Sequence, residues 1–113
     1  MNPAEARRRA HAFLRRKQLL STAETEQALD VAAVVLGESL ARLAQAAESR
    51  DGIACVEAAH GLKGNLLNLG LPELAAAAQA IQEQAQTGDF PAVTTAIPAL
   101  CASLAALTGP LRD

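Results

Sequence analysis

Apolar residues recur every three or four positions along almost the whole chain, and polar or helix-breaking residues interrupt them at intervals. This period places apolar side chains on one face of an α-helix. The clearest stripe, within residues 21–50, consists of Leu29, Ala33, Leu36, Leu40, Leu43 and Ala47. Similar stripes follow in three later segments. The pattern therefore predicts a succession of amphipathic helices.

Residues that start and stop helices divide this pattern into segments. Ser21 and Glu24 form a capping box that begins the longest helix, and Asp51-Gly52 ends it. Asp51 can cap the following helix, after which Gly70 suits the left-handed position that ends many helices. The later boundaries are Pro72, Gly88-Asp89 and Gly109-Pro110.

Short connections between long amphipathic helices favour antiparallel neighbours. We therefore predict an all-α fold, an antiparallel up-down four-helix bundle over residues 21–109. Residues 1–20 add a short basic helix, and residues 1–113 are expected to form one domain. Pro98 lies within the last segment, Val93 to Leu107. Because proline lacks a backbone donor, Pro98 should kink that helix or mark its true start.

The net charge of −2 hides an asymmetry between the N-terminal helix and the rest of the chain. Residues 1–20 hold six basic residues and one acid, a net +5, so the remainder carries −7. A basic arm can bind nucleic acid or an anionic lipid surface. However, this arm also carries an apolar stripe of Ala6, Ala10, Phe13 and Leu14. The stripe favours a helix that packs on the acidic body, without nucleic acid as a partner.

The composition gives no sign of membrane insertion or export. Half of the residues are apolar, but no apolar run approaches the roughly 18 residues that a membrane span needs. No apolar segment typical of a signal peptide follows the N-terminal arginines. Cys55 and Cys101 match neither a metal-ligand nor a redox spacing, and each lies on or near a core stripe. The simplest expectation is a reduced, cytoplasmic protein.

The helix after Asp51 has two different faces when its residues are placed at 100° intervals. One face is a core stripe of Cys55, Ala58, Ala59, Leu62, Leu66 and Leu69. His60, Lys63 and Gly64 fall on the opposite side, among the apolar residues Ile53, Val56 and Leu67. A glycine within a helix costs about 1 kcal/mol relative to alanine. Here it removes the side chain one turn after the histidine, so that a large group can approach the imidazole. This arrangement favours reversible binding of a charged group brought by another protein.

The run His60-Gly61-Leu62-Lys63-Gly64, followed by Gly70, resembles the H-x-L-K-G-x5-G signature of histidine-phosphotransfer (HPt) domains. The resemblance extends from about Leu29 to Leu107, because that family is a four-helix bundle with its histidine on the second bundle helix. It implies that His60 accepts a phosphoryl group on Nε2 from an aspartyl phosphate of a receiver domain and passes it to another. A neutral imidazole is nucleophilic enough for this step.

The resemblance also implies roles for neighbouring residues and for partners. Lys63 would offset phosphate charge, and Gly64 would admit the receiver's active site. Family members often orient the histidine with a glutamine of the next helix, which corresponds to Gln82. The partners would be response-regulator receiver domains and a hybrid histidine kinase. The receiver would supply Mg²⁺, and this chain would be a monomeric phosphocarrier without its own cofactor, kinase activity or nucleotide site.

The expected docking surface around His60 consists of Ile53, Val56, Glu57, Leu67 and Asn68. Three other functions compete with phosphotransfer. A histidine-kinase dimerisation domain normally has an acid directly after its histidine, where this chain has Gly61. A non-phosphorylated adaptor could bind or inhibit a signalling partner through the same surface. A metal site is the weakest alternative, since only Glu57 lies at ligand spacing from His60. His11 lacks comparable neighbours and is expected to be an ordinary surface residue.

Overall fold

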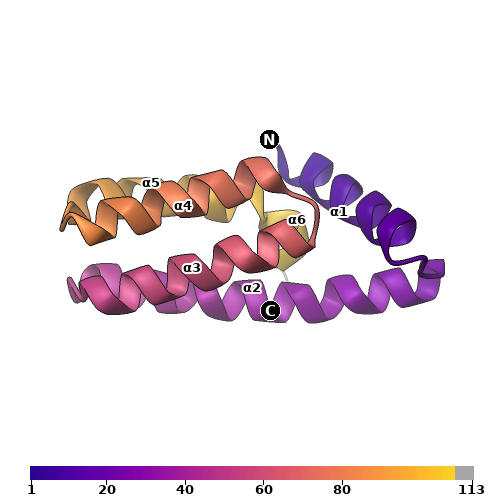
Figure 1. Ribbon diagram of the computed structural model, residues 1–113, viewed down its shortest axis with the longest axis horizontal. Coiled ribbons are helices and arrows are strands. Elements are labelled where there is room, and N and C mark those ends of the chain that lie inside the picture. The colour runs from indigo at the N-terminus through magenta and orange to yellow at the C-terminus, as the bar shows by residue number, and fades with distance from the viewer. Residues whose placement is uncertain (109–113) are drawn as a thin grey trace.

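The computed structural model describes residues 1–108, in which it contains six α-helices and no strand. The helices are α1 (Pro3–Lys17), α2 (Thr22–Glu48), α3 (Gly52–Asn68), α4 (Pro72–Gln86), α5 (Phe90–Ser103) and α6 (Ala105–Thr108). Helices α2 to α5 lie alongside one another as an antiparallel bundle, and α1 crosses one end of it (Figure 1). The prediction of an all-α bundle with an extra N-terminal helix is confirmed. The predicted Gly109-Pro110 boundary lies outside the described residues.

The predicted helix boundaries have the expected local chemistry. The Ser21 side chain accepts a hydrogen bond from the Glu24 backbone N–H at 3.1 Å, and the Glu24 carboxylate accepts one from the Ser21 backbone N–H at 2.8 Å. Hydrogen bonding of the Glu24 carboxylate to Ser21, first by its backbone N–H and then by its side chain, lowers the pKa of Glu24. Asp51 accepts a hydrogen bond from the Ala54 backbone N–H at 3.1 Å and so caps α3. Pro72 occupies the first turn of α4, where its missing donor costs nothing.

The core follows the apolar stripes closely. Every predicted core residue of α2 and α3 is buried, as are Leu74, Ala78, Ile81 and Ala85 of α4. Burying a leucine or isoleucine side chain contributes about 1.5–3 kcal/mol relative to leaving it in water. The hydrophobic stripes therefore account for the association of the four helices.

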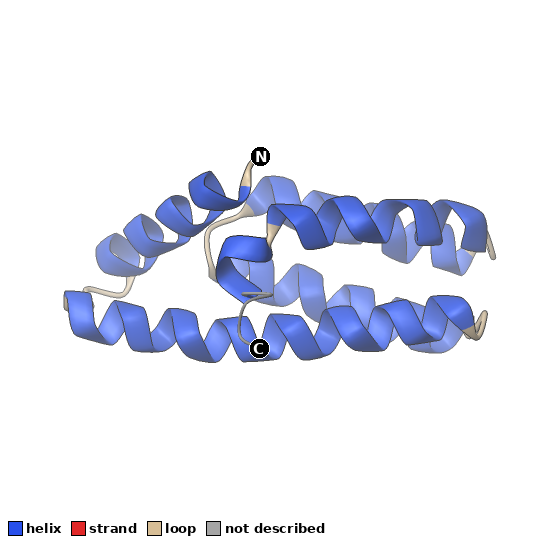
Figure 2. Ribbon diagram, turned by 180° about the vertical axis from the view of Figure 1, so that it is seen from behind, coloured by secondary structure: helices blue, strands red, loops and turns tan. Residues whose placement is uncertain are grey.

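The last predicted helix is divided in two, contrary to the sequence expectation. It ends at Ser103, and the separate turn α6 follows. Pro98 lies inside α5, which begins eight residues earlier at Phe90, so it does not mark the start of the helix. The break turns the chain inward: α6 contacts both α1 and α2 (Figure 2), and Leu104 and Leu107 are both buried.

Helix α1 packs on the bundle through its apolar stripe, as predicted: Ala6, Ala10 and Leu14 are buried. The half-buried ring of Phe13 lies against Gly70, at the turn between α3 and α4. Two ion pairs add to this contact. Arg9 donates two hydrogen bonds to Glu73 of α4 at 2.9 and 3.1 Å, and Arg7 donates one to Glu26 of α2 at 2.7 Å. None of the described helices is long and apolar enough to cross a membrane.

Candidate functional site

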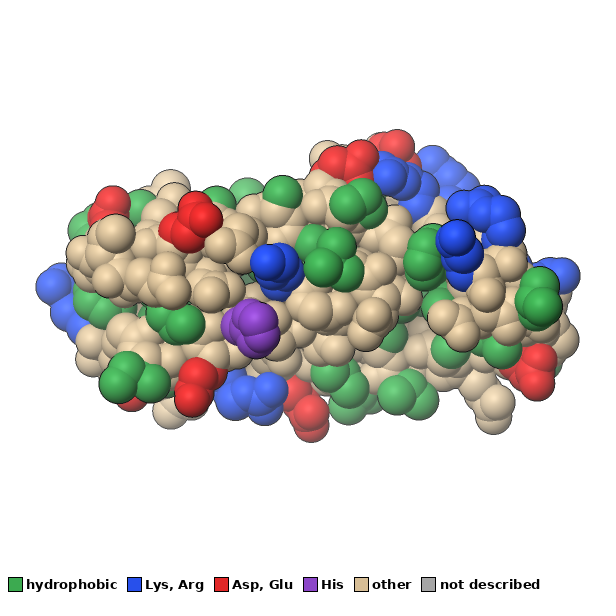
Figure 3. Space-filling view, viewed as in Figure 1, with side chains coloured by type: hydrophobic (Ala, Val, Ile, Leu, Met, Phe, Trp, Pro, Cys, Tyr) green, Lys and Arg blue, Asp and Glu red, His purple; other side chains and the backbone are tan. Residues whose placement is uncertain are grey.

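His60 lies near the middle of α3 with its side chain exposed, on the face opposite the core stripe. Gly61 and Gly64 are exposed on the same helix, and a Cβ added to either would meet nothing within 4 Å. The histidine side chain over α3 is visible on the face shown in Figure 3. The structure thus agrees with the prediction of an accessible imidazole beside open surface.

Lys63 is placed differently from the expectation of an outward-facing side chain. It is half-buried, and its Nζ donates a hydrogen bond of 2.9 Å to Oε1 of Gln79 on α4. Gln79 Nε2 in turn donates to Glu83 Oε2 at 2.9 Å. Lys63 starts at the flank of α3, and its long aliphatic stem lets the ammonium group reach the neighbouring helix. Its positive charge is therefore held on the α4 side of His60.

The short turn between α3 and α4 places Gln82 near the level of the histidine. Only residues 69–71 separate the two helices, with Gly70 at the centre. Positions equally distant from Gly70 therefore lie at about the same level on the two antiparallel helices. On this basis Ala80 is opposite His60, and Gln82 lies two residues further along α4.

The side chain of Gln82 has an unusual hydrogen-bonding state. Its Oε1 is buried and has no partner among the described residues, a state that it shares with Gln84 Oε1, whereas buried polar atoms in proteins are nearly always hydrogen-bonded. No hydrogen bond joins Gln82 to His60 in the described part of the chain. The structure thus places Gln82 near the level of His60 and leaves its Oε1 without a partner.

Most of the predicted docking surface is exposed. Ile53 and Leu67 keep 77% and 46% of their surface accessible, although both are large apolar residues. Glu57 and Asn68 are also exposed. Val56 differs from the expectation, because it is half-buried and packs against the core. It lies toward α4 and, with Ile53, lines a shallow groove of about 380 Å³ between the two helices.

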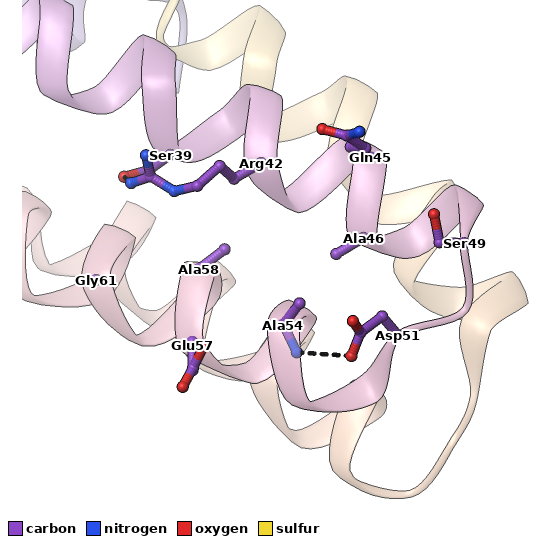
Figure 4. A pocket seen from close by; sticks show the side chains of 10 residues that line it. All are labelled: Ser39, Arg42, Gln45, Ala46, Ser49, Asp51, Ala54, Glu57, Ala58 and Gly61. Atoms are coloured by element: carbon purple, nitrogen blue, oxygen red, sulfur yellow. Dashed lines mark hydrogen bonds between the residues drawn. The ribbon is translucent and has the colours of Figure 1, made fainter.

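A second groove, between α2 and α3, was not foreseen from the sequence. Its volume is about 500 Å³ (Figure 4), and it is lined by Ser39, Arg42, Gln45, Ala46, Ser49, Asp51, Ala54, Glu57, Ala58 and Gly61. Arg42 Nη2 donates a hydrogen bond of 3.2 Å to the buried Ser39 Oγ. The groove reaches the residue next to His60. The one available sequence signal was that Arg42 is the only basic residue of α2.

The remaining reactive side chains lie elsewhere. His11 Nε2 is 3.3 Å from Glu26 Oε2, a contact between α1 and α2 that the sequence did not reveal. Burial raises the pKa of the Cys55 and Cys101 thiols, and Asp51 raises that of Cys55 further, so both favour the unreactive protonated form. Within residues 1–108, no three His, Cys, Asp or Glu side chains gather as a metal site would require.

Comparison with known protein families gives a match over most of the chain. Residues 27–109 match the family model of the Hpt domain. The matched range begins within α2 and includes all of α3, α4, α5 and α6, and therefore His60 and both grooves. Neither a curated protein nor a solved structure matches the chain.

Proposed function

This chain belongs to the Hpt domain family, and we propose that it is a phosphorelay intermediate that carries its phosphoryl group on His60. Modules of this family are phosphocarriers, not kinases. The upstream partner would be a receiver domain of a hybrid histidine kinase, and the downstream partner that of a response regulator. The observation that carries the proposal is the exposed His60 on α3, flanked by surface that Gly61 and Gly64 leave open.

The transfer begins with neutral His60, whose Nε2 lone pair attacks the phosphorus of a receiver aspartyl phosphate. A P–N bond forms as the P–O bond breaks, and the electron pair leaves with the receiver's carboxylate. No proton need move, because Nδ1 keeps its hydrogen and the product is a phosphoimidazolium. Such a reaction depends mainly on in-line positioning and charge neutralisation. The receiver would supply Mg²⁺ and most of the catalytic groups.

Lys63 is proposed to neutralise part of the phosphoryl charge. An ammonium group has three donors, and Gln79 uses one of them in the present structure. The remaining donors are available for phosphate oxygens without loss of that contact. The link from Lys63 through Gln79 to Glu83 also holds the ammonium on the α4 side of the histidine.

Gln82 is proposed as a positioning residue for the imidazole. Attack by Nε2 requires that Nδ1 carry the proton, and an acceptor at Nδ1 selects that tautomer. The supporting observations are the position of Gln82 on α4, within two residues of the level of His60, and its buried Oε1 without a partner. Gln82→Leu should slow transfer several-fold without weakening receiver binding, whereas Gln82→Glu, which keeps an acceptor, should restore part of the rate. Equal rates in all three proteins would contradict this role.

The docking surface for the receiver is proposed to be the exposed apolar area around His60. Ile53 and Leu67 would contribute apolar contact, with Val56 at its edge and Glu57 and Asn68 supplying polar contacts. Gly64 lies within this area and has no side chain to hold the partner away. Exposed apolar side chains around a reactive group are typical of a protein-binding surface.

The deciding experiment is phosphotransfer to the full chain from receiver domains that have been phosphorylated with acetyl phosphate and Mg²⁺. Wild type should gain an acid-labile, alkali-stable phosphate, and the matched variant His60→Gln should gain none. Receiver binding by both proteins is measured in parallel, by calorimetry. If wild type binds a receiver and never gains label, the protein is a non-phosphorylated adaptor, and the proposed function is wrong.

A further inference from the structure

We infer that Arg42 of α2 is a second phosphoryl-binding side chain, which approaches His60 across Gly61 from the side opposite Lys63. This inference rests on the proposed function, because it concerns the phosphoryl group on His60. It assigns a role to the groove between α2 and α3, and to Gly61 a second role besides leaving the surface beside His60 open.

The connection between α2 and α3 places Arg42 near the histidine. Only residues 49–51 separate the two helices, with Arg50 at the centre of the turn. Positions equally distant from Arg50 therefore lie at about the same level on the two antiparallel helices. On this basis Ser39 is opposite Gly61, which adjoins His60.

The Arg42 side chain runs along α2 toward this level. Its Nη2 lies 3.2 Å from Ser39 Oγ, so the guanidinium group reaches the position of Ser39. Figure 4 shows the side chain extending from Arg42 to Ser39, with Ala58 and Gly61 on the opposite side of the groove. The guanidinium therefore stands across from Gly61, one residue from the phosphoryl acceptor.

Lys63 and Arg42 lie toward different helices. The Nζ of Lys63 is bonded to Gln79 of α4, whereas Arg42 is the single basic residue of α2. Helix α3 packs against both α2 and α4. The two cations therefore lie toward the two helices that flank the histidine helix.

The guanidinium group of Arg42 has donors to spare. It has five N–H donors, and one bonds to Ser39. Among the described residues, no carboxylate lies within 4 Å of it. Glu38 is one turn away on α2, and the side chain of Glu57, across the groove, points away from Arg42 (Figure 4). A phosphoryl group could therefore form hydrogen bonds with Arg42 without displacing an ion pair.

Gly61 keeps the path between the two groups open. It is exposed, and a Cβ built on it meets no atom within 4 Å. A large side chain at this position would stand between the guanidinium and a phosphoryl group on the adjacent histidine. The two open glycines thus have different roles. Gly64 lets the partner approach His60, and Gly61 lets Arg42 of this chain approach it.

The test measures the phosphoryl group directly, without a receiver. The full chain is phosphorylated with potassium phosphoramidate, and the ³¹P signal of the phosphohistidine is titrated with pH. Its absence in His60→Gln assigns the signal. A nearby cation favours the dianion and lowers the titration midpoint. In Arg42→Gln we expect the midpoint to rise by about 0.2–0.7 pH units, whereas Arg42→Lys should keep part of the effect.

Two further variants separate a local contact from other causes. Arg16→Gln removes one exposed positive charge from α1 and should leave the midpoint unchanged. Gly61→Leu should raise it almost as much as Arg42→Gln, with little further rise when the two are combined. Circular dichroism verifies that each variant remains helical.

The outcomes distinguish this inference from the proposed function. Equal midpoints in wild type and Arg42→Gln would overturn the role of Arg42 and leave phosphotransfer by His60 intact. An equal rise of the midpoint in Arg16→Gln would show that the midpoint responds to net charge alone. That result would also overturn the role of Arg42. Failure of receiver-dependent labelling in wild type would refute the proposed function, even if the midpoint depends on Arg42.

Discussion

Two glycines of one sequence motif, six residues apart, have contrasting surroundings. Gly64 lies inside α3 with open space where a Cβ would stand. Gly70 follows the end of α3, has a φ of +72°, and would place a Cβ only 2.3 Å from Cγ of Phe13. The fold requires the glycine at Gly70. It gains nothing from the glycine at Gly64, which weakens the helix.

The contrast separates two regions of the molecule. Around Gly70, the turn between α3 and α4 lies against Phe13 of α1, so a Cβ added there would have to displace that side chain. Around Gly64, the surface is open and includes His60. A residue that costs stability and contacts nothing within the chain is best explained by a partner outside it.

Gly70→Ala should have the largest effect on stability. A left-handed φ costs an alanine about 1–2 kcal/mol, and overpacking against Phe13 adds about 1–3 kcal/mol. We expect the free energy of unfolding to fall by about 2–5 kcal/mol, measured by urea denaturation followed by circular dichroism.

Gly88 provides a matched control for this substitution. It too has a left-handed backbone, with a φ of +77°, but a Cβ there would meet nothing within 4 Å. Gly88→Ala should therefore cost only the backbone part, about 1–2 kcal/mol. Gly70→Ala made in a Phe13→Ala background should cost a similar amount. If both alanine variants lose the same stability in the wild-type background, close packing by α1 is not what selects Gly70.

Gly64→Leu should leave the fold intact while impairing transfer. Leucine is a good helix former and the site is open, so the free energy of unfolding should not fall. One turn after His60, the new side chain would occupy the approach of the receiver. We expect the transfer rate to fall at least about tenfold, which corresponds to about 1.4 kcal/mol of transition-state stabilisation. Unimpaired transfer would remove the steric explanation of Gly64.

Gly64→Ala isolates the stability cost of the open site. Replacing a helical glycine by alanine in free space should raise the free energy of unfolding by about 0.5–1 kcal/mol. The small methyl group should reduce transfer less than leucine does. Urea denaturation and the labelling assay on the same preparations measure both effects. A loss of stability would show that Gly64 also has a structural role.

The sequence predicted the features that depend on neighbours along the chain. The capping box at Ser21 and Glu24, the cap at Asp51 and the core stripes follow from local spacing, and all are present. The exposed face of α3 was predictable for the same reason, because helical periodicity alone sets His60 opposite the core. The fold class and the exposed position of His60 therefore required no knowledge of tertiary contacts.

The features that the sequence missed depend on how helices are aligned with one another. The hydrogen bond from Lys63 to Gln79 requires the relative position of α3 and α4, and the groove lined by Arg42 requires that of α2 and α3. The close contact of Phe13 with Gly70 requires the docking of α1. The division between α5 and α6 follows from burial of Leu104 and Leu107 beneath other helices. Periodicity within one helix carries none of this information.

The ion pair between Arg9 and Glu73 should have the smallest effect, although it lies at the same end of the bundle as Gly70. The hydrogen bonds from Arg9 lower the pKa of Glu73. A carboxyl with a lowered pKa stabilises the fold above the pH at which an unfolded glutamate titrates, about 4.3. That contribution is lost as the pH falls through the lower value in the folded protein.

Glu73→Gln should therefore reduce the urea midpoint only slightly near neutral pH, and less at high salt, because both side chains are exposed to solvent. Its decline in stability below about pH 4 should be shallower than that of wild type. Glu24, whose pKa is lowered by its hydrogen bonds with Ser21, remains in both proteins and accounts for part of the acid sensitivity they share. A loss at neutral pH as large as that of Gly70→Ala would mean that charge, rather than the packing of Phe13 on Gly70, holds α1 against this end of the bundle.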